Sequence, residues 1–120
     1  MENQFKEEIE ALDTLKGYNV KVVKALEEII PELKGEKKED TDEYLKHILT
    51  GINWEIEVIN GTMGYINRDG EVISKDKVNQ IILDLNDAIQ KKQDMEIAGI
   101  MENRMLPFLV SLSGIIEEKM

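Results

Sequence analysis

Apolar residues recur along most of this chain at alternating intervals of three and four residues, the spacing that lines one side of an α-helix. Four segments carry such a stripe, and polar or charged residues separate them. Helices of this kind bury their stripes against one another, and short connections make neighbouring helices antiparallel. The pattern therefore predicts an all-α fold, an antiparallel four-helix bundle, with residues 1–120 in a single helical-bundle domain.

The first segment has the longest stripe, interrupted only where Lys16 and Asn19 take apolar places. Gly17 leaves one continuous helix or two as alternatives, because an interior glycine costs only about 1 kcal/mol relative to alanine. Pro31 falls in the last turn, and the charged residues after it predict a surface loop. The apolar positions of the stripe are Phe5, Ile9, Leu12, Val23, Leu26, Ile30 and Leu33.

Capping residues mark the starts of the other three helices. Asp40 can accept a hydrogen bond from the amide of Glu43, and Glu43 can reach back, which is the capping-box pattern. Ser74 and Asp94 are the expected caps of the third and fourth helices.

The connection between the second and third helices carries a turn signal. Asp69-Gly70 lies between "YI" and "EVI", and Asp-Gly between apolar residues is a strong signal for a two-residue hairpin. A short β-hairpin near residues 64–74 is therefore one expectation. A fraying helix end followed by a loop is the other, because an isolated hairpin is marginally stable in water.

Pro107 lies in the middle of the most apolar helix. It cannot donate to the carbonyl of Asn103, and its ring presses on that carbonyl, a defect of ~3 kcal/mol or more in an unassisted helix. Asn103 and Arg104 offer polar groups near the freed carbonyl, so we expect a kink rather than a stop. The apolar stripe of this helix consists of Ala98, Met101, Met105, Phe108, Leu112 and Ile115.

Hardly any polar face remains between Met105 and Ile116, so this helix has to be covered on nearly all sides. The other three helices alone could cover it, as in a monomeric bundle. The alternative is a surface that also takes a protein partner or a second copy in a homodimer, since methionine adapts to varied partners and aromatic residues are enriched at interfaces. We expect that surface on the second and fourth helices, at Trp54, Met101, Met105 and Phe108.

Charge and composition exclude several classes of function. Twenty-five acidic and fifteen basic side chains give a formal net charge of −10, which repels a nucleic-acid backbone or an anionic membrane surface. The absence of cysteine removes thiol chemistry. No apolar run approaches the ~20 residues of a membrane span, and the first residues lack the pattern of a signal peptide. We expect a cytoplasmic protein that binds neither nucleic acid nor membrane.

No pattern of catalytic or cofactor-binding residues emerges. His47 is the only histidine and follows Glu43 by four residues, whereas di-iron bundles place a glutamate three residues before each of two histidines. Glu55, Glu57 and Glu102 could form a carboxylate pair, but acids on helices of so acidic a chain usually form the solvated face. We therefore expect no catalytic, cofactor or metal residues. The rival is an enzyme, or a bundle binding a small ligand or metal, whose interior holds Glu43, His47 and Glu102.

The C-terminal region carries a pattern found in other proteins. The run "LNDAIQKKQD" followed by "AGIMENRMLPFL" resembles the signature of small helical proteins of Firmicutes-type bacteria, in which "ALENxD" precedes "ADLLEYELxPLL". The chain keeps Ala98, Glu102 and Pro107, but has Gly99 in place of aspartate and "NR" at 103–104 in place of tyrosine and glutamate. The resemblance implies a helical fold and a chaperone-like or flagellum-associated role without enzymatic activity. We therefore expect a non-enzymatic protein-interaction module.

Overall fold

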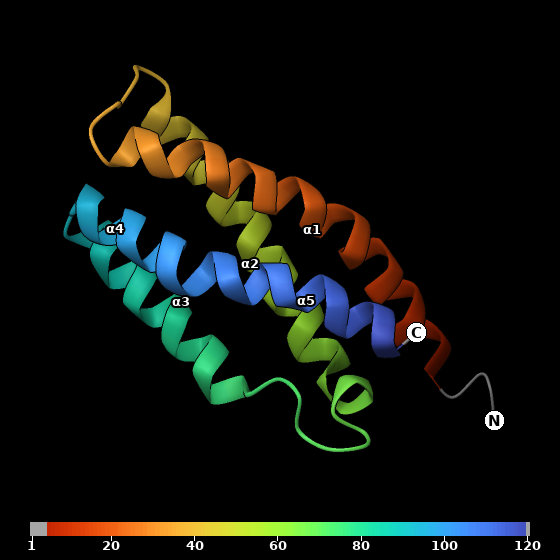
Figure 1. Cartoon of the computed structure of the whole chain (residues 1–120). Helices are drawn as coiled ribbons and strands as arrows, with labels where there is room; N and C mark the ends of the chain where they lie inside the picture. The colour runs from red at the N-terminus through yellow and green to blue at the C-terminus, as the bar shows by residue number, and fades with distance from the viewer. Residues whose placement is uncertain (1–4, 120) are drawn as a thin grey trace.

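The computed structural model describes residues 5–119, and every regular element in that range is helical (Figure 1). This confirms the predicted all-α bundle. The last three elements follow one another without a loop and form one long C-terminal rod. The helices are α1 (Lys6–Leu33), α2 (Thr41–Ile66), α3 (Lys75–Gln90), α4 (Asp94–Ile100), the π-helical η2 (Met101–Met105) and α5 (Leu106–Lys119).

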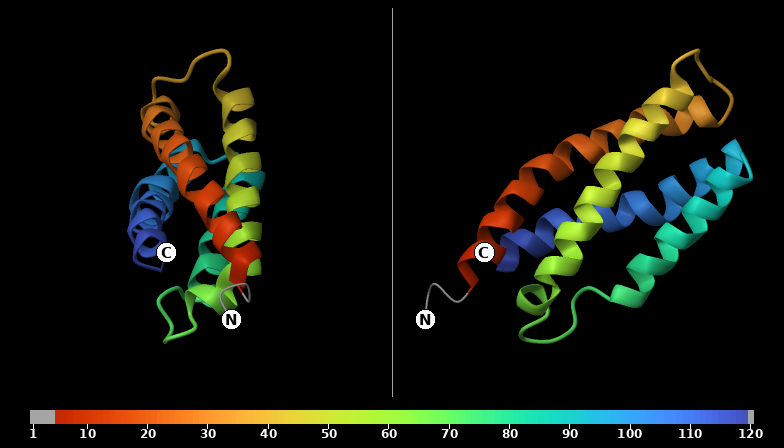
Figure 2. Two further views of the ribbon diagram at one scale, coloured as in Figure 1. Left: turned by 90° about the vertical axis from the view of Figure 1, so that its right-hand side faces the viewer. Right: turned by 180° about the vertical axis from the view of Figure 1, so that it is seen from behind.

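Two antiparallel helical hairpins make up the bundle (Figures 1 and 2). The first is α1 with α2, and the second is α3 with the C-terminal rod. Helix α1 packs on α2 and also along the C-terminal rod, whereas α3 packs on α4 and η2 and diverges from α5. The molecule is elongated, with extents of 52 × 24 × 19 Å. None of the helices of residues 5–119 combines the length and the apolar character that crossing a membrane requires.

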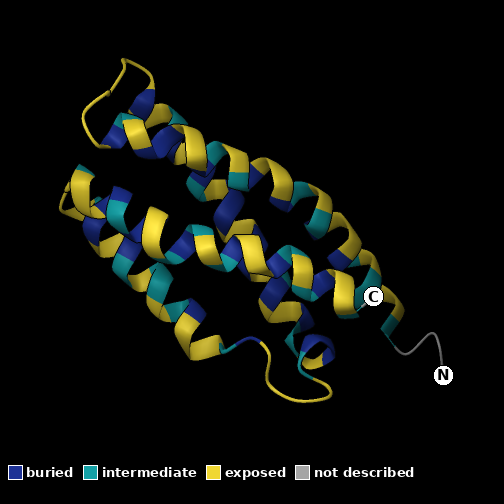
Figure 3. Cartoon of the chain, viewed as in Figure 1, coloured by how far each residue is buried: buried dark blue, intermediate teal, exposed yellow. Residues whose placement is uncertain are grey.

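The core follows the inward sides of the rods, and exposed positions form their outer sides (Figure 3). Each fully buried leucine or isoleucine contributes roughly 1.5–3 kcal/mol relative to an exposed position. Most side chains with no exposed surface come from α1, α2 and the C-terminal rod, whereas α3 contributes Ala88. They include Leu12, Leu15, Leu26, Ile29, Ile59, Ile66, Leu109, Leu112 and Ile116.

Helix α1 is continuous through Gly17, which settles the question of one helix or two. The residues that begin the other helices differ in part from the prediction. Ser74 caps α3 as expected, and its hydroxyl accepts from the amide of Lys77 at 3.3 Å. Asp40 precedes α2 but its side chain makes no capping hydrogen bond. Asp94 is the first residue of α4 instead of the residue before it.

The expectation of a β-hairpin near residues 64–74 is wrong: residues 64–66 end α2, and no strand occurs within residues 5–119. The side chain of Asn67 organises the connection instead. Its Oδ1 accepts from the amides of Val72 and Ile73 at 2.9 and 3.1 Å, and its Nδ2 donates to the carbonyl of Ile73 at 3.0 Å. These bonds take the backbone groups that a hairpin partner would need, and they hold Ile73 in the core.

Pro107 does not stop the C-terminal rod, as predicted, and the side chain of Arg104 pairs with Asp84. The turn before it, η2, is π-helical, and the amide of Leu106 donates to the carbonyl of Met101, five residues back. A π turn contains one residue more than an α turn and commonly appears as a single insertion in an α-helix. Because the turn is wider, the rod accommodates the proline ring and its missing donor without ending.

The inserted residue also changes which side chains face the core. The buried positions Ile97, Met101, Met105 and Leu109 are spaced four apart, a spacing that would drift around a regular α-helix. The wider turn compensates for the drift and keeps these side chains on one side. Beyond Pro107 two positions of the predicted stripe give way to the residues after them, since Leu109 and Ile116 are buried whereas Phe108 and Ile115 are only half-buried. Leu112 is buried as predicted.

The two glycines that face different surroundings in the first hairpin give a test of this packing. Gly17 is exposed and has open space where a Cβ would lie, so Gly17→Ala should raise the free energy of unfolding by about 0.5–1 kcal/mol through helix propensity. A Cβ on Gly51 would lie 2.5 Å from the hydroxyl of Tyr18, which packs edge-on against Trp54. Gly51→Ala should gain less and should alter the emission of Trp54, as urea unfolding and fluorescence spectra would show.

Candidate functional site

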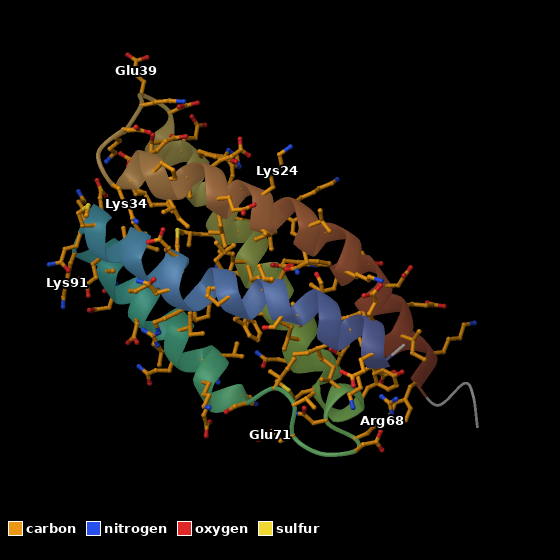
Figure 4. All side chains as sticks on the ribbon, in the orientation of Figure 1. Lys24, Lys34, Glu39, Arg68, Glu71 and Lys91 are labelled. Carbon is orange, nitrogen blue, oxygen red and sulfur yellow. The ribbon has the colours of Figure 1, made fainter. Side chains whose placement is uncertain are left out.

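A groove lies between α3, the loop before it and α5. The ribbons of α3 and α5 diverge in this part of the bundle (Figure 1). The groove has a volume of about 370 Å³, and the loop before α3 closes its wide end. Glu71, Ser74 and Lys77 lie at its edge, and Glu71 projects outward from the loop (Figure 4). The apolar lining comes from Val72 and Ile73 of the loop, Val78 and Ile81 of α3, and Phe108 and Ile115 of α5.

The local sequence explains why apolar side chains are available here. Phe108 and Ile115 are two helical turns apart on α5, and Ser111 lies between them on the same side. They face the groove because the π turn rotates Leu109 and Ile116 into the core in their place. The half-buried lining on α5 is therefore a direct consequence of the extra residue before Pro107.

Within residues 5–119, polar contacts join α3 to the C-terminal rod at η2 and not along the groove. Arg104 of η2 pairs with Asp84 of α3 at 2.6 Å. In the part of the chain that the structure describes, no hydrogen bond or ion pair joins α3 to α5. The two helices can thus differ in separation at the wide end of the groove while their narrow end stays packed on η2.

The structure does not bring the four predicted interface residues together. Met101 and Met105 have 0 % and 1 % of their surface exposed and belong to the core, so they cannot form part of a docking surface on this folded chain. Trp54 is 38 % exposed and lies on the α1–α2 hairpin against Tyr18, with ring centroids 5.2 Å apart. Phe108 alone of the four lines the groove. The prediction of one surface across α2 and α4 is corrected accordingly.

The polar groups of the rival prediction are also placed differently. Glu43 and His47 are exposed on α2, and Glu102 of η2 pairs with Lys34 at 2.6 Å on the surface. They do not meet in the interior. Among residues 5–119, no group of three or more His, Cys, Asp or Glu side chains is positioned to hold a metal ion.

The interior acid is instead Glu55 of α2, which is 0 % exposed. Both of its carboxylate oxygens lack a hydrogen-bond partner among the described residues. Burial disfavours the charged form and raises the pKa of Glu55 to about 8. The prediction that Glu55 belongs to the solvated face is therefore wrong.

Asn19 of α1 is the second buried polar side chain of this region, also with no exposed surface. Its Nδ2 donates to the carbonyl of Leu109 at 2.7 Å and to the hydroxyl of Ser113 at 2.9 Å, both on α5. Its Oδ1 has no partner within residues 5–119. We call Glu55 and Asn19 the polar layer, because the neighbouring buried positions of α1, α2 and α5 are apolar.

The sequence itself indicates that both members of the polar layer are buried. Asn19 occupies an apolar place in the stripe of α1, and Glu55 falls three residues after Ile52 and four before Ile59 on the buried side of α2. Spacing therefore placed Glu55 inside, and the general abundance of acids in this chain argued wrongly for the surface.

Fold and geometry define an all-α bundle with an apolar groove and a buried polar layer. The chain belongs to the family described as a domain of unknown function (DUF8042), whose model matches residues 10–115. The match spans all four rods, including the polar layer and the α5 side of the groove. No curated protein and no solved structure matches the chain.

The two hydrogen bonds of Asn19 predict a graded effect on stability. Asn19→Ala removes both bonds to α5 and leaves a cavity, and should lower the free energy of unfolding by about 1–3 kcal/mol. Ser113→Ala removes only the second bond and should have the smaller effect. Urea unfolding followed by circular dichroism checks the order. Equal effects of the two variants would show that the bond to the Leu109 carbonyl contributes nothing.

Proposed function

We propose that this chain is a non-enzymatic protein-binding module that holds an amphipathic helical segment of a partner protein in the α3–α5 groove, and that it acts in the cytoplasm. The proposal rests on the apolar lining of a groove left open between two diverging helices. The resemblance to small bacterial helical proteins supports a chaperone-like role of this kind. Glu43, His47 and Glu102, the residues named for the rival, lie at exposed positions and not in the bundle interior.

A helix is the secondary structure that suits this groove. Apolar side chains at intervals of three and four on a partner helix would enter between α3 and α5 as a further helix of the bundle. Val72, which is 47 % exposed, and the half-buried Ile81 and Ile115 would be covered by such a segment. Covering them removes apolar surface from water, which is the main favourable contribution to association of this kind.

Charge selects the kind of partner. The net charge of −10 gives a field that attracts cationic segments and repels acidic ones. It also opposes association with a second copy of the same chain, which carries the same charge. We therefore commit to an amphipathic helix with lysine or arginine on its polar face, and not to a homodimer.

Groove variants should weaken binding of such a helix. The probe is a synthetic amphipathic peptide of leucine and lysine, titrated with fluorescence anisotropy. Val72→Asp and Ile81→Asp place a charge in the apolar lining and should each reduce affinity at least tenfold, about 1.4 kcal/mol. The matched control is Val20→Asp on α1, which is 63 % exposed and outside the groove.

Two further peptides separate the groove from general electrostatic attraction. A leucine–glutamate peptide of the same pattern should bind more weakly, and a lysine peptide without leucine should bind without sensitivity to Ile81→Asp. Equal loss of affinity in Val20→Asp and Ile81→Asp, or unchanged affinity in both groove variants, would show that the peptide binds elsewhere. Sedimentation of the protein alone tests the excluded alternative, since a stable dimer would contradict the commitment to a second protein.

A further inference from the structure

We infer that the polar layer of Glu55 and Asn19 is a proton-dependent contact that keeps α5 packed on α1 and α2, and through α5 regulates the shape of the α3–α5 groove. The part that concerns the groove rests on the proposed function. The part that concerns the packing of α5 stands on the buried groups themselves.

Asn19 and Glu55 lie at the same height along the α1–α2 hairpin. Their sequence neighbours, Tyr18 and Trp54, are in edge-on contact with ring centroids 5.2 Å apart. Both Asn19 and Glu55 point away from solvent, since neither has any exposed surface. The aromatic pair thus marks the outer side of the hairpin at this level, and the polar layer marks its inner side.

The donors and acceptors of the polar layer explain why protonation of Glu55 affects the cost of burying it. An ionised carboxylate only accepts, and Asn19 already uses its Nδ2 on the carbonyl of Leu109 and the hydroxyl of Ser113. With Glu55 ionised, the layer contains three buried oxygens without a donor: Asn19 Oδ1 and both carboxylate oxygens of Glu55. Protonation of Glu55 removes the buried charge and adds one O–H donor, so the neutral layer is far less costly to bury.

Within residues 5–119, no neighbouring cation offsets the charge of an ionised Glu55. Burial is the cause of the raised pKa of Glu55, with no charged side chain contributing. The core positions next to the layer, Leu15 on α1 and Leu112 on α5, are apolar. Lys16 of α1 and Glu117 of α5 pair with each other at 3.1 Å, with 37 % and 70 % of their side chains exposed. On α2 itself, Glu57 is exposed.

Helix α5 connects the polar layer with the groove because it contributes to both. On its inner side the Leu109 carbonyl and the Ser113 hydroxyl accept from Asn19 of the polar layer, and on its outer side Phe108 and Ile115 line the groove. When Glu55 ionises, water has to reach the carboxylate, and the packing of α5 on α1 and α2 must loosen to admit it. A loosened α5 changes its separation from α3, which no polar contact between these two helices within residues 5–119 opposes.

The direction of the pH effect follows from linkage. The folded-state pKa of Glu55 is raised to about 8, above its unfolded value of 4.5. Between these values the folded chain binds one proton more than the unfolded chain, so stability falls as pH rises and levels off above pH 8. Within that window the equilibrium constant for unfolding should rise up to about tenfold per pH unit.

The direct test is a titration of the wild-type chain. With ¹³C in the glutamate side chains, the carboxyl carbon of Glu55 should titrate between pH 7 and 9. This measurement needs no variant to fold. A midpoint of Glu55 below pH 5.5 would sink the inference.

The second test compares hydrogen exchange in the wild type, Glu55→Gln and the control Glu57→Gln, measured at pH 6 and pH 8.5. Glutamine keeps the shape and a donor but cannot ionise, so the amides of α5 should lose at least tenfold more protection with pH in the wild type than in Glu55→Gln. Comparing the chains at the same pH cancels the intrinsic pH dependence of exchange. Glu57→Gln should behave as the wild type does. Equal losses in the wild type and Glu55→Gln would overturn the inference.

Peptide binding separates the two proposals. The leucine–lysine peptide should bind the wild type differently at pH 6 and pH 8.5, and Glu55→Gln identically at both. If the peptide fails to bind in the groove while exchange behaves as expected, the proposed function fails and the proton-dependent packing stands. If the peptide binds with the same affinity at both pH values in both chains, the groove stands and its regulation by Glu55 is wrong.

Discussion

The constraint on which the rest of the structure depends is the missing amide hydrogen of Pro107 in an otherwise unbroken apolar rod. A regular α-helix cannot place a proline at that point without a clash and a lost hydrogen bond. The rod widens by one residue over Met101–Met105 instead, and this sets the orientation of everything beyond it. Leu109 meets the carboxamide of Asn19 through its carbonyl, and Phe108 turns toward α3. The core contact and the groove therefore have a common origin.

The apolar core stabilises this part of the bundle, whereas burial of the polar layer destabilises it. Burial of the leucine and isoleucine side chains of α1, α2 and α5 stabilises the folded state strongly. The fold can therefore contain a buried acid, although burial of its ionised form costs several kcal/mol. Replacing such a group with a hydrophobic side chain of similar size is often neutral or stabilising in proteins. Its presence beside an otherwise apolar seam is thus not explained by stability, and a regulated α5 gives it a physical role.

Most of the fold could be predicted from spacing alone, because periodic apolar residues leave few alternatives to helices packed in a bundle. Spacing could not predict which residues face the core beyond Pro107. The π turn inserts one residue, and Leu109 and Ile116 are buried in place of Phe108 and Ile115. The predicted site failed at Met101 and Met105 for another reason, because the other helices of the chain bury both side chains almost completely. At Glu55 the prediction rested on composition alone and did not use the spacing from Ile52 and Ile59, which indicates a buried position. The hairpin failed because the side chain of Asn67 took the backbone partners that a strand requires.

A binding groove benefits from a wall whose packing can be adjusted, and α5 has the features of such a wall. Elements that move on binding come from the less stable parts of a structure. On its inner side α5 meets a layer whose hydrogen bonding is complete only in part, and on its outer side it has no polar contact with α3 among the described residues. The narrow end is different, because Arg104 and Asp84 hold η2 against α3 there. Motion of α5 would accordingly widen or narrow the groove from one end, with the π turn as the point about which the separation changes.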